Sequence, residues 1–182
     1  MFKTLLIPIT MALMPQISPA AEAWKLDGKV IHVEDGDTLT IMLDDHSKYS
    51  IRLTDIDAPE TSHGPRKLGQ PFSKVSKNSL TRLAINQRAV ATCFEYDVHK
   101  TRPVCAVDVA GMDLSMEQLR RGMVWVYRAN PRYVRRTAAY SLEDQARADR
   151  IGLWADPASN PIPPWKWRKQ CWRDSECAGA GE

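Results

Sequence analysis

Three short runs of strand-forming residues near the start of the chain constrain its fold most strongly. They are separated by acidic, polar turns and span residues 29–33, 38–43 and 49–53. In the second run apolar residues occupy every other position, and in the third Ile51 and Leu53 flank Arg52. Since successive side chains of a strand point to opposite faces, Arg52 points away from the apolar face. The pattern predicts a sheet that buries one face and presents this arginine either to solvent or to a ligand groove.

The rest of the chain adds helices and a hairpin to this sheet. A helix is predicted to open near Pro71, because proline is favoured in the first turn. Its apolar stripe, at roughly helical spacing, consists of Phe72, Val75, Leu80 and Leu83. Further elements are predicted at 89–96 and 104–109, as the two strands of a hairpin, and at 113–121 and 135–150, as helices. Taken alone, these patterns indicate an α+β protein with a strand-rich first half.

The first 23 residues are organised like an export signal. Lys3 is the only charged residue before Glu22, the stretch 5–14 is mostly apolar, and small residues follow at 18–23. A membrane anchor is the alternative, but this run is well short of the ~20 residues that a spanning helix needs. We therefore expect signal cleavage and a mature protein that is not attached to the membrane. Residues 24–156 then form one compact domain, and 157–182 a proline-rich linker with a tail.

Four cysteines in an exported chain predict two disulfides. Cys93 and Cys105 lie in the two strands of the predicted hairpin, and Cys171 and Cys177 would close a small loop in the tail. These pairs are favoured among the three possible pairings. Zinc binding is the competing interpretation, but the spacings lack a paired C-x-x-C pattern.

Basic residues cluster in two places, although the net charge of +3 is itself a weak signal. Residues 118–136 contain six arginines and no acid, together with Trp125, Tyr127 and Tyr133. Basic groups among aromatic rings suit a nucleic acid, and a solvated arginine face over core aromatics fits equally well. The tail, from Trp165 to Arg173, is also basic and aromatic. Packing against the domain is the preferred interpretation of the tail, and contact with nucleic acid is the alternative.

Two motifs beside the predicted strands carry the candidate chemistry. Asp35-Gly36-Asp37-Thr38 precedes the second strand, and the stretch from Arg52 to Glu60 ends the third. Asp37 and Asp57 stand at the ends of separate strands, where their oxygens can converge on one ion. Carboxylates and carbonyls suit Ca²⁺. A softer metal is disfavoured, because the only nearby histidine, His63, is interpreted as a loop residue.

The ordered set of motifs resembles the thermonuclease (staphylococcal nuclease-like) family. It comprises Asp35 to Thr38, Arg52-Leu53, Asp57 to Glu60, Gln70-Pro71-Phe72 and Arg102, and the resemblance runs from about residue 29 to 154. It implies a five-stranded OB-fold-type β-barrel with about three helices, so that 24–156 is a nuclease domain. It also implies a calcium-dependent nuclease that hydrolyses DNA and RNA with little sequence specificity and leaves 3′-phosphate ends. The export signal predicts a periplasmic or secreted location, and a monomer is the default because the sequence carries no oligomer signal.

The resemblance also implies the residue roles. Calcium would be bound by the carboxylates of Asp37 and Asp57 and the Ala58 carbonyl, with Asp35 beside the ion. Glu60 would orient or deprotonate the attacking water, and Arg52 and Arg102 would grip the scissile phosphate. Tyr127 matches a tyrosine near the nucleotide. Lys100 stands where the family commonly has tyrosine, and it would supply charge to the substrate instead.

Two other interpretations remain open at this point. One is a non-catalytic nucleic-acid-binding module on the same scaffold, because a fold alone does not determine function. The other is an envelope protein whose acidic turns bind calcium only for stability. The joint presence of Asp37, Arg52, Asp57, Glu60 and Arg102 favours the enzyme.

Overall fold

The computed structural model describes residues 22–99, 101–156 and 160–177. Most of the predicted export signal, residues 1–21, therefore lies outside the described residues, as does Lys100. Within the described part, no helix is long and apolar enough to cross a membrane.

A closed, five-stranded mixed β-barrel forms the centre of the structure. Its strands are β1 (Trp24–Val33), β2 (Thr38–Met42), β3 (Lys48–Leu53), β5 (Arg88–Tyr96) and β6 (Pro103–Val109). Antiparallel pairing gives the order β3-β2-β1-β5-β6, and a parallel pairing of β3 with β6 closes the barrel. Three two-residue strands complete the sheets: β4 (Ile56–Asp57), β7 (Met112–Asp113) and β8 (Trp125–Val126). The OB-fold-type α+β fold predicted from the sequence is confirmed.

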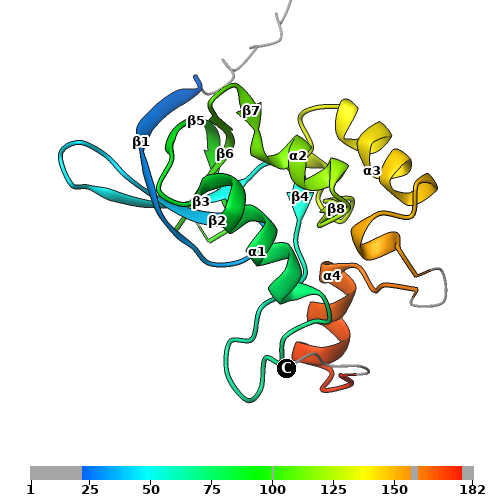
Figure 1. Ribbon diagram of the computed structural model, residues 1–182. Helices are drawn as coiled ribbons and strands as arrows, with labels where there is room; N and C mark the ends of the chain where they lie inside the picture. The colour runs from blue at the N-terminus through cyan, green and yellow to red at the C-terminus, as the bar shows by residue number, and fades with distance from the viewer. Residues whose placement is uncertain (1–21, 100, 157–159, 178–182) are drawn as a thin grey trace, which may run out of the picture.

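The described residues contain four α-helices besides the barrel (Figure 1). They are α1 (Ser73–Ala84), α2 (Leu114–Arg120), α3 (Ala138–Ala148) and α4 (Pro164–Trp167), and η1 (Pro131–Tyr133), η2 (Gly152–Trp154) and η3 (Arg168–Arg173) are short turns of other helix types. The helix α1 begins two residues after Pro71, near which its start was predicted, and α2 and α3 lie inside the predicted ranges 113–121 and 135–150. The fourth, α4, belongs to the tail, for which no helix was predicted. In Figure 1 it lies away from the barrel, beside the loop that leads to α1.

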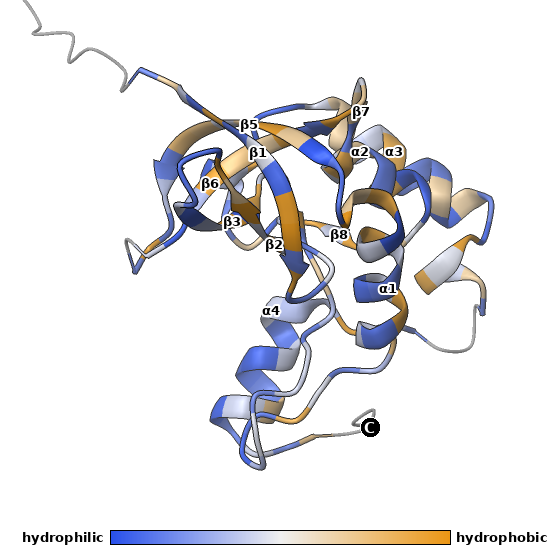
Figure 2. Ribbon diagram, turned by 60° about the vertical axis from the view of Figure 1, so that its left-hand side comes forward, coloured by the Kyte–Doolittle hydropathy of each residue, from blue (hydrophilic) through white to orange (hydrophobic). Residues whose placement is uncertain are grey.

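The buried core consists of side chains on the inner faces of the barrel strands. Along these strands hydrophobic and hydrophilic residues alternate, and the tail is mainly hydrophilic (Figure 2). The alternation in β2 places Leu39 and Ile41 in the core at 0% exposure, and in β3 Ile51 and Leu53 flank the partly exposed Arg52. The predicted outward direction of Arg52 is therefore confirmed.

The predicted apolar stripe of α1 is partly wrong. Leu80 is buried, but Val75 is 44% exposed, and the inner face instead carries Ser73, Ser76 and Ser79. The physical reason is close approach, because a Cβ at Gly36 would overlap the hydroxyl of Ser76. Only small side chains allow α1 to pack this closely against the turn before β2.

Both favoured disulfides are present. Cys93 pairs with Cys105 across β5 and β6, where the two residues stand opposite each other in the ladder. Cys171 pairs with Cys177 in the tail. All four cysteines are thus oxidised, which leaves no thiolate for the competing zinc interpretation.

The arginines of residues 118–136 are paired with acids outside this segment, of which Glu117 directly precedes it. Arg120 and Arg121 contact Glu117, Arg128 contacts Glu143, Arg132 and Arg135 contact Glu95, and Arg136 contacts Asp55 and Asp113. Trp125 and Tyr133 are buried. Of the two interpretations, the one with core aromatics under a paired arginine face describes most of this segment.

Asp55 and Glu143 each accept four hydrogen bonds, and Asp55 connects the chain before β4 to the start of the α3 region. It is fully buried and accepts hydrogen bonds from the backbone of Arg135 (2.6 Å) and from the side chain of Arg136 (2.6 and 2.8 Å). Asp55→Ala should therefore lower the free energy of unfolding by about 1–3 kcal/mol, because the backbone N–H groups of Arg135 and Arg136 lose their buried acceptor. Urea unfolding measures this change.

The matched control is Asp44→Ala, which removes an acid that also pairs with an arginine but is 82% exposed on its side chain. A surface pair contributes about 0–1 kcal/mol. Equal effects of the two substitutions would contradict the structural role assigned to Asp55.

Candidate active site

The turn before β2 holds the first two carboxylates of the site. Asp35 Oδ1 accepts a hydrogen bond from the backbone N–H of Asp37 (2.9 Å), which closes the turn. Gln118 donates from its side chain to the carbonyl of Gly36 (3.1 Å) and fixes the turn from α2. Asp37 itself is 2% exposed and accepts hydrogen bonds from the Thr38 hydroxyl and the Ala58 N–H, both at 2.9 Å. The Asp37 carboxylate is therefore held in one orientation.

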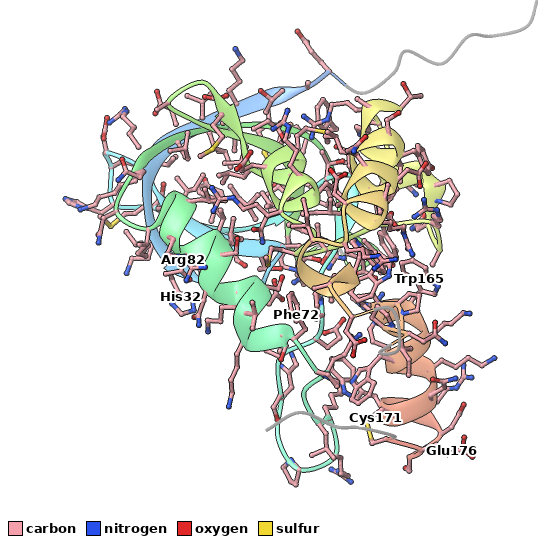
Figure 3. The ribbon with its side chains drawn as sticks, turned by 45° about the vertical axis from the view of Figure 1, so that its right-hand side comes forward. His32, Phe72, Arg82, Trp165, Cys171 and Glu176 are labelled. Atoms are coloured by element: carbon pink, nitrogen blue, oxygen red, sulfur yellow. A yellow bond between two sulfur atoms is a disulfide. The ribbon has the colours of Figure 1, made fainter. Side chains whose placement is uncertain are left out.

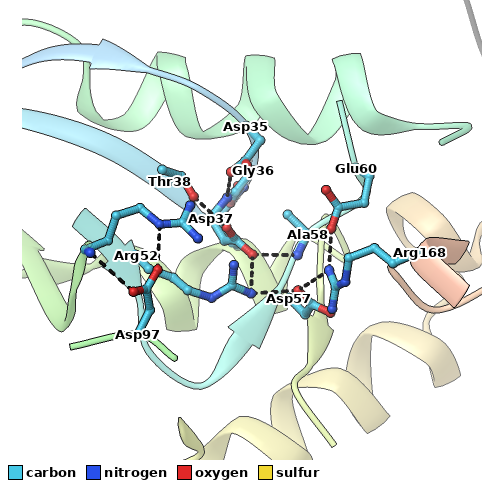
Figure 4. Close-up of polar contacts among 12 residues, drawn as sticks. Asp35, Gly36, Asp37, Thr38, Arg52, Asp57, Ala58, Glu60, Asp97 and Arg168 are labelled. Carbon is cyan, nitrogen blue, oxygen red and sulfur yellow. Dashed lines mark hydrogen bonds and ion pairs between the residues drawn. The ribbon is translucent and has the colours of Figure 1, made fainter. Parts of the chain in front are cut away.

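Arg52 connects this turn to the second motif (Figure 4). One nitrogen of its guanidinium lies 3.2 Å from Asp37 Oδ2 and 2.7 Å from Asp57 Oδ1. Arg52 stands opposite Thr38 in the β2–β3 ladder, and Asp57 is held in β4 by pairing with Trp125. The fold thus brings together two carboxylates that are 20 residues apart in the sequence, as predicted.

Glu60 adjoins the same cluster through an arginine that was not among the predicted site residues. Arg168, from the tail, donates to Asp57 Oδ1 (3.1 Å) and Asp57 Oδ2 (2.8 Å), and it also donates to Glu60 Oε1. The backbone of Glu60 is held by Gln70, whose N–H donates to the Glu60 carbonyl (2.8 Å). Tail, β4 and the loop before α1 therefore meet at one point.

Arg102 lies at the other side of the site and pairs with Asp97. Its Nε is 3.0 Å from Asp97 Oδ2, and its side chain is 31% exposed. Asp97 also accepts a hydrogen bond from the backbone of Thr101 (2.9 Å), so it fixes the loop between β5 and β6. Within this loop Lys100 lies outside the described residues, and its predicted role in substrate binding stays a prediction.

The ring of Tyr127 lies beneath two of the guanidinium groups. The guanidinium carbon of Arg52 lies 5.3 Å from the ring centroid and that of Arg168 lies 5.9 Å from it. Such cation–π contacts favour a positive charge on the ring face. The ring of Tyr127 thus stabilises the positive charges of Arg52 and Arg168.

A cavity of about 720 Å³ collects these groups. The predicted residues that line it are Asp37, Arg52, Ala58, Glu60, Arg102 and Tyr127, together with Asp35. Asp57 is 1% exposed and does not line the cavity, but it contacts Arg52 and Arg168, which do. Arg66, Lys67, Arg168 and Trp172 add positive charge and an aromatic ring at one side. His63 also lines it, from the exposed loop predicted for it.

Burial and crowding of the acids determine the proton affinities in this cluster. Burial, with the neighbouring charge of Asp37, raises the pKa of Asp35 well above its usual value. Burial also opposes ionisation of Asp37, but Arg52 and the Ala58 N–H outweigh it and lower the pKa of Asp37. Burial raises the pKa of Glu60 to about 7, against the opposing charge of Arg168. The acids are therefore only partly compensated by the arginines.

The oxygen donors of this cluster match a hard divalent cation in their chemistry, although not in their present arrangement. Three carboxylates (Asp37, Asp57 and Glu60) contact the guanidinium groups of Arg52 and Arg168, so the acids outnumber the arginines in contact, and Asp35 lies in the adjoining turn. Hard oxygen ligands of this kind suit Ca²⁺. Among the described residues no three His, Cys, Asp or Glu side chains already surround one metal position, and the carboxylate oxygens instead face the arginines.

Sequence reasoning missed Arg168 because its partners are remote in the chain. Asp57 and Glu60 precede it by 111 and 108 residues, and no local pattern indicates which of several tail cations turns inward. The available signal was the basic, aromatic composition of the tail. Of its two interpretations, the preferred one, packing against the domain, is confirmed.

Fold and site together define an OB-fold-type barrel with a carboxylate- and arginine-lined cleft suited to an anionic substrate. The family model described as "Staphylococcal nuclease homologue" matches residues 50–156. The chain belongs to the staphylococcal nuclease-like family. This membership places it in the nuclease class of hydrolases, whose substrates are nucleic acids.

Curated relatives of similar length agree with this assignment. An "Uncharacterized endonuclease" of Haemophilus influenzae is 32% identical over 142 residues, which are 78% of this chain and 72% of the relative. A "Micrococcal nuclease" of Shigella flexneri is 32% identical over 154 residues, covering 78% of this chain and 80% of the relative. An "Uncharacterized endonuclease" of Escherichia coli O157:H7 is 31% identical over 143 residues, covering 79% and 85%.

The close contact between α1 and the turn that holds Asp37 leaves little room for a side chain at Gly36. A Cβ there would overlap the Ser76 hydroxyl and lie 2.9 Å from the Ala58 Cβ. We expect Gly36→Ala to lower the free energy of unfolding by about 1–3 kcal/mol, as for other overpacked sites, and urea unfolding measures it.

The double variant Gly36→Ala/Ser76→Ala is the control, because it removes the overlapping oxygen, which has no hydrogen-bond partner. It should be more stable than Gly36→Ala alone. A single Gly36→Ala variant as stable as the unaltered protein would show that the packing is looser than described.

Proposed function

We propose that the protein is a calcium-dependent nuclease that hydrolyses phosphodiester bonds of DNA and RNA with little sequence specificity, leaving 3′-phosphate ends. The observation that carries this proposal is the Arg52 bridge between Asp37 and Asp57, in contact with the cavity that Glu60 and Arg102 also line. A binding module without catalysis needs no such convergence of acids and arginines.

The residues can divide the reaction between them. Ca²⁺ held by Asp37, Asp57 and the Ala58 carbonyl would neutralise charge on the phosphate and polarise it. Arg52 and Arg102 would bind the phosphoryl oxygens, because a guanidinium presents paired planar donors that match them. Glu60 would orient the attacking water or accept its proton while the bond from phosphorus to the 5′ oxygen breaks. Preorganised positive charge then stabilises the charge that accumulates in the transition state.

The remaining parts of the proposal concern location and assembly. We propose that residues 1–23 direct export to the periplasm or the medium and that the mature protein acts as a monomer that is not attached to the membrane. The two disulfides support an oxidising compartment. In this division, 24–156 is the nuclease domain and 157–182 its linker and tail.

Calcium dependence has a direct test. The mature protein is incubated with single-stranded DNA or RNA in calcium and in chelator, and the ends of the products are identified. We expect cleavage in calcium only, with 3′-phosphate ends, and a loss of at least about 10²-fold in Glu60→Gln. Tight binding without cleavage would support the non-catalytic module instead, and inertness with a calcium-raised melting temperature would support the stabilising role.

The two arginines should differ in what their removal does. Arg102→Ala should lower kcat/KM by about 10²–10³-fold and leave folding intact, because Arg102 is partly exposed. Arg52→Lys keeps the charge beside the two buried aspartates but loses the paired donors, and it should lose a similar factor. Steady-state kinetics and a melting curve are measured for each variant. Near-normal activity of Arg52→Lys would show that charge alone suffices there.

A further inference from the structure

The contacts of Arg168 are those of a site residue rather than of a surface cation. Its guanidinium makes paired contacts with Asp57, contacts Glu60 and lies over Tyr127. Its side chain is 27% exposed and lines the same cavity as Arg52 and Arg102. One edge of the guanidinium group is therefore bonded to the acids, while part of the group remains accessible from the cavity.

The tail holds Arg168 in place by contacts on both sides of it. Before it, the Gln70 side chain donates to the Ile162 carbonyl (2.5 Å), and the indole of Trp167, which is 1% exposed, donates to the Leu68 carbonyl (3.2 Å). After it, the indole of Trp172 donates to the same carbonyl (2.9 Å). Figure 3 shows Trp165 and the disulfide-bonded Cys171 on this segment.

These anchors make the ion pairs of Arg168 unnecessary for attaching the tail. Two indole hydrogen bonds to Leu68, the hydrogen bond from Gln70 to Ile162 and the buried Trp167 already attach the segment to the loop before α1. Desolvating a guanidinium beside two acids is costly unless the arrangement has another use. The unusual feature is therefore the direction of Arg168 itself, which points toward the acids that the proposed cation would also require.

We propose that Arg168 is a third arginine of the nuclease site, which neutralises Asp57 and Glu60 in the empty site and binds a phosphate oxygen of the nucleic acid once a cation takes its place at Asp57. This inference rests on the proposed function. A divalent cation and a guanidinium cannot both occupy the same side of one carboxylate, so cation binding frees the donors of Arg168. The freed donors lie at the wall of the cavity that Arg52 and Arg102 share, where the phosphate is expected.

If a cation replaces Arg168 at Asp57, the variant Arg168→Ala should change the affinities for calcium and for nucleotide in opposite directions. Calcium affinity without nucleotide should increase by about 3-fold or more, because a positive charge in contact with two acids is removed. In saturating calcium, affinity for a deoxynucleoside 3′-phosphate, which contains no phosphodiester to cleave, should fall by about 10-fold or more, because a charge-assisted hydrogen bond is lost. Isothermal titration calorimetry on the full mature chain measures both.

Two further variants sharpen the test. Arg168→Lys keeps the charge and should recover part of the nucleotide affinity. Lys169→Ala removes one positive charge from the same turn at an exposed position outside the cavity, and both affinities should stay within about 2-fold of the unaltered protein. A melting curve confirms that each variant is folded.

The outcomes separate this inference from the nuclease proposal. If the unaltered protein binds calcium and nucleotide but Arg168→Ala changes nucleotide affinity less than about 2-fold, or weakens both ligands together, the role of Arg168 is overturned and the nuclease proposal stands. If Arg168→Ala leaves the calcium affinity unchanged, a cation does not replace Arg168 at Asp57, and that part of the proposal is overturned. An unaltered protein that binds neither ligand would overturn both proposals.

Discussion

The bridge from Arg52 to Asp37 and Asp57 is the interaction on which the rest of the site depends. It joins the turn before β2 to β4, and it does so from a strand whose other face belongs to the core. Without this guanidinium, Asp57 would still be paired with Arg168, but the almost fully buried Asp37 would be left with the neutral donors of Thr38 and Ala58. A buried carboxylate without a cationic partner is costly. The barrel therefore needs the arginine for stability at the same place where a phosphodiester needs it for binding. Stability and chemistry are coupled at this position, so a change to Arg52 affects both.

Close packing determines where the acids stand. The serine-lined face of α1 lies against Gly36, and Gln118 of α2 donates to the Gly36 carbonyl and to that of Ser76. The turn is thus held by two helices and by a strand, and these contacts also restrict the position of the Asp37 carboxylate. Sites built on such rigid elements keep their geometry better than sites on free loops. In contrast, the loop that carries Arg102 depends chiefly on Asp97 for its position.

Much of the fold was predictable from the sequence, because alternation in the barrel strands and the burial of one sheet face express the same constraint. The convergence of Asp37, Arg52, Asp57 and Glu60 was predictable through the ordered motifs of the family. The α1 stripe was not, because close approach to Gly36 favoured serines over larger apolar residues. The pairing of the arginines in 118–136 was hidden for a different reason. Their acids, such as Glu95 and Glu143, lie outside the segment, and a local charge count cannot register them.

The tail shows why ion pairs between residues far apart in the chain cannot be predicted from a sequence pattern. A sequence pattern indicates that residues 165–173 are basic and aromatic, but it does not say which cation enters the site. The structure selects Arg168 because the indoles of Trp167 and Trp172 both bond to the Leu68 carbonyl, and the short helical turn between them directs one side chain inward. The loop that supplies this carbonyl follows Glu60 directly. The position of the tail and the position of Glu60 are consequently linked through one short stretch of backbone, so that the tail is part of the architecture of the site.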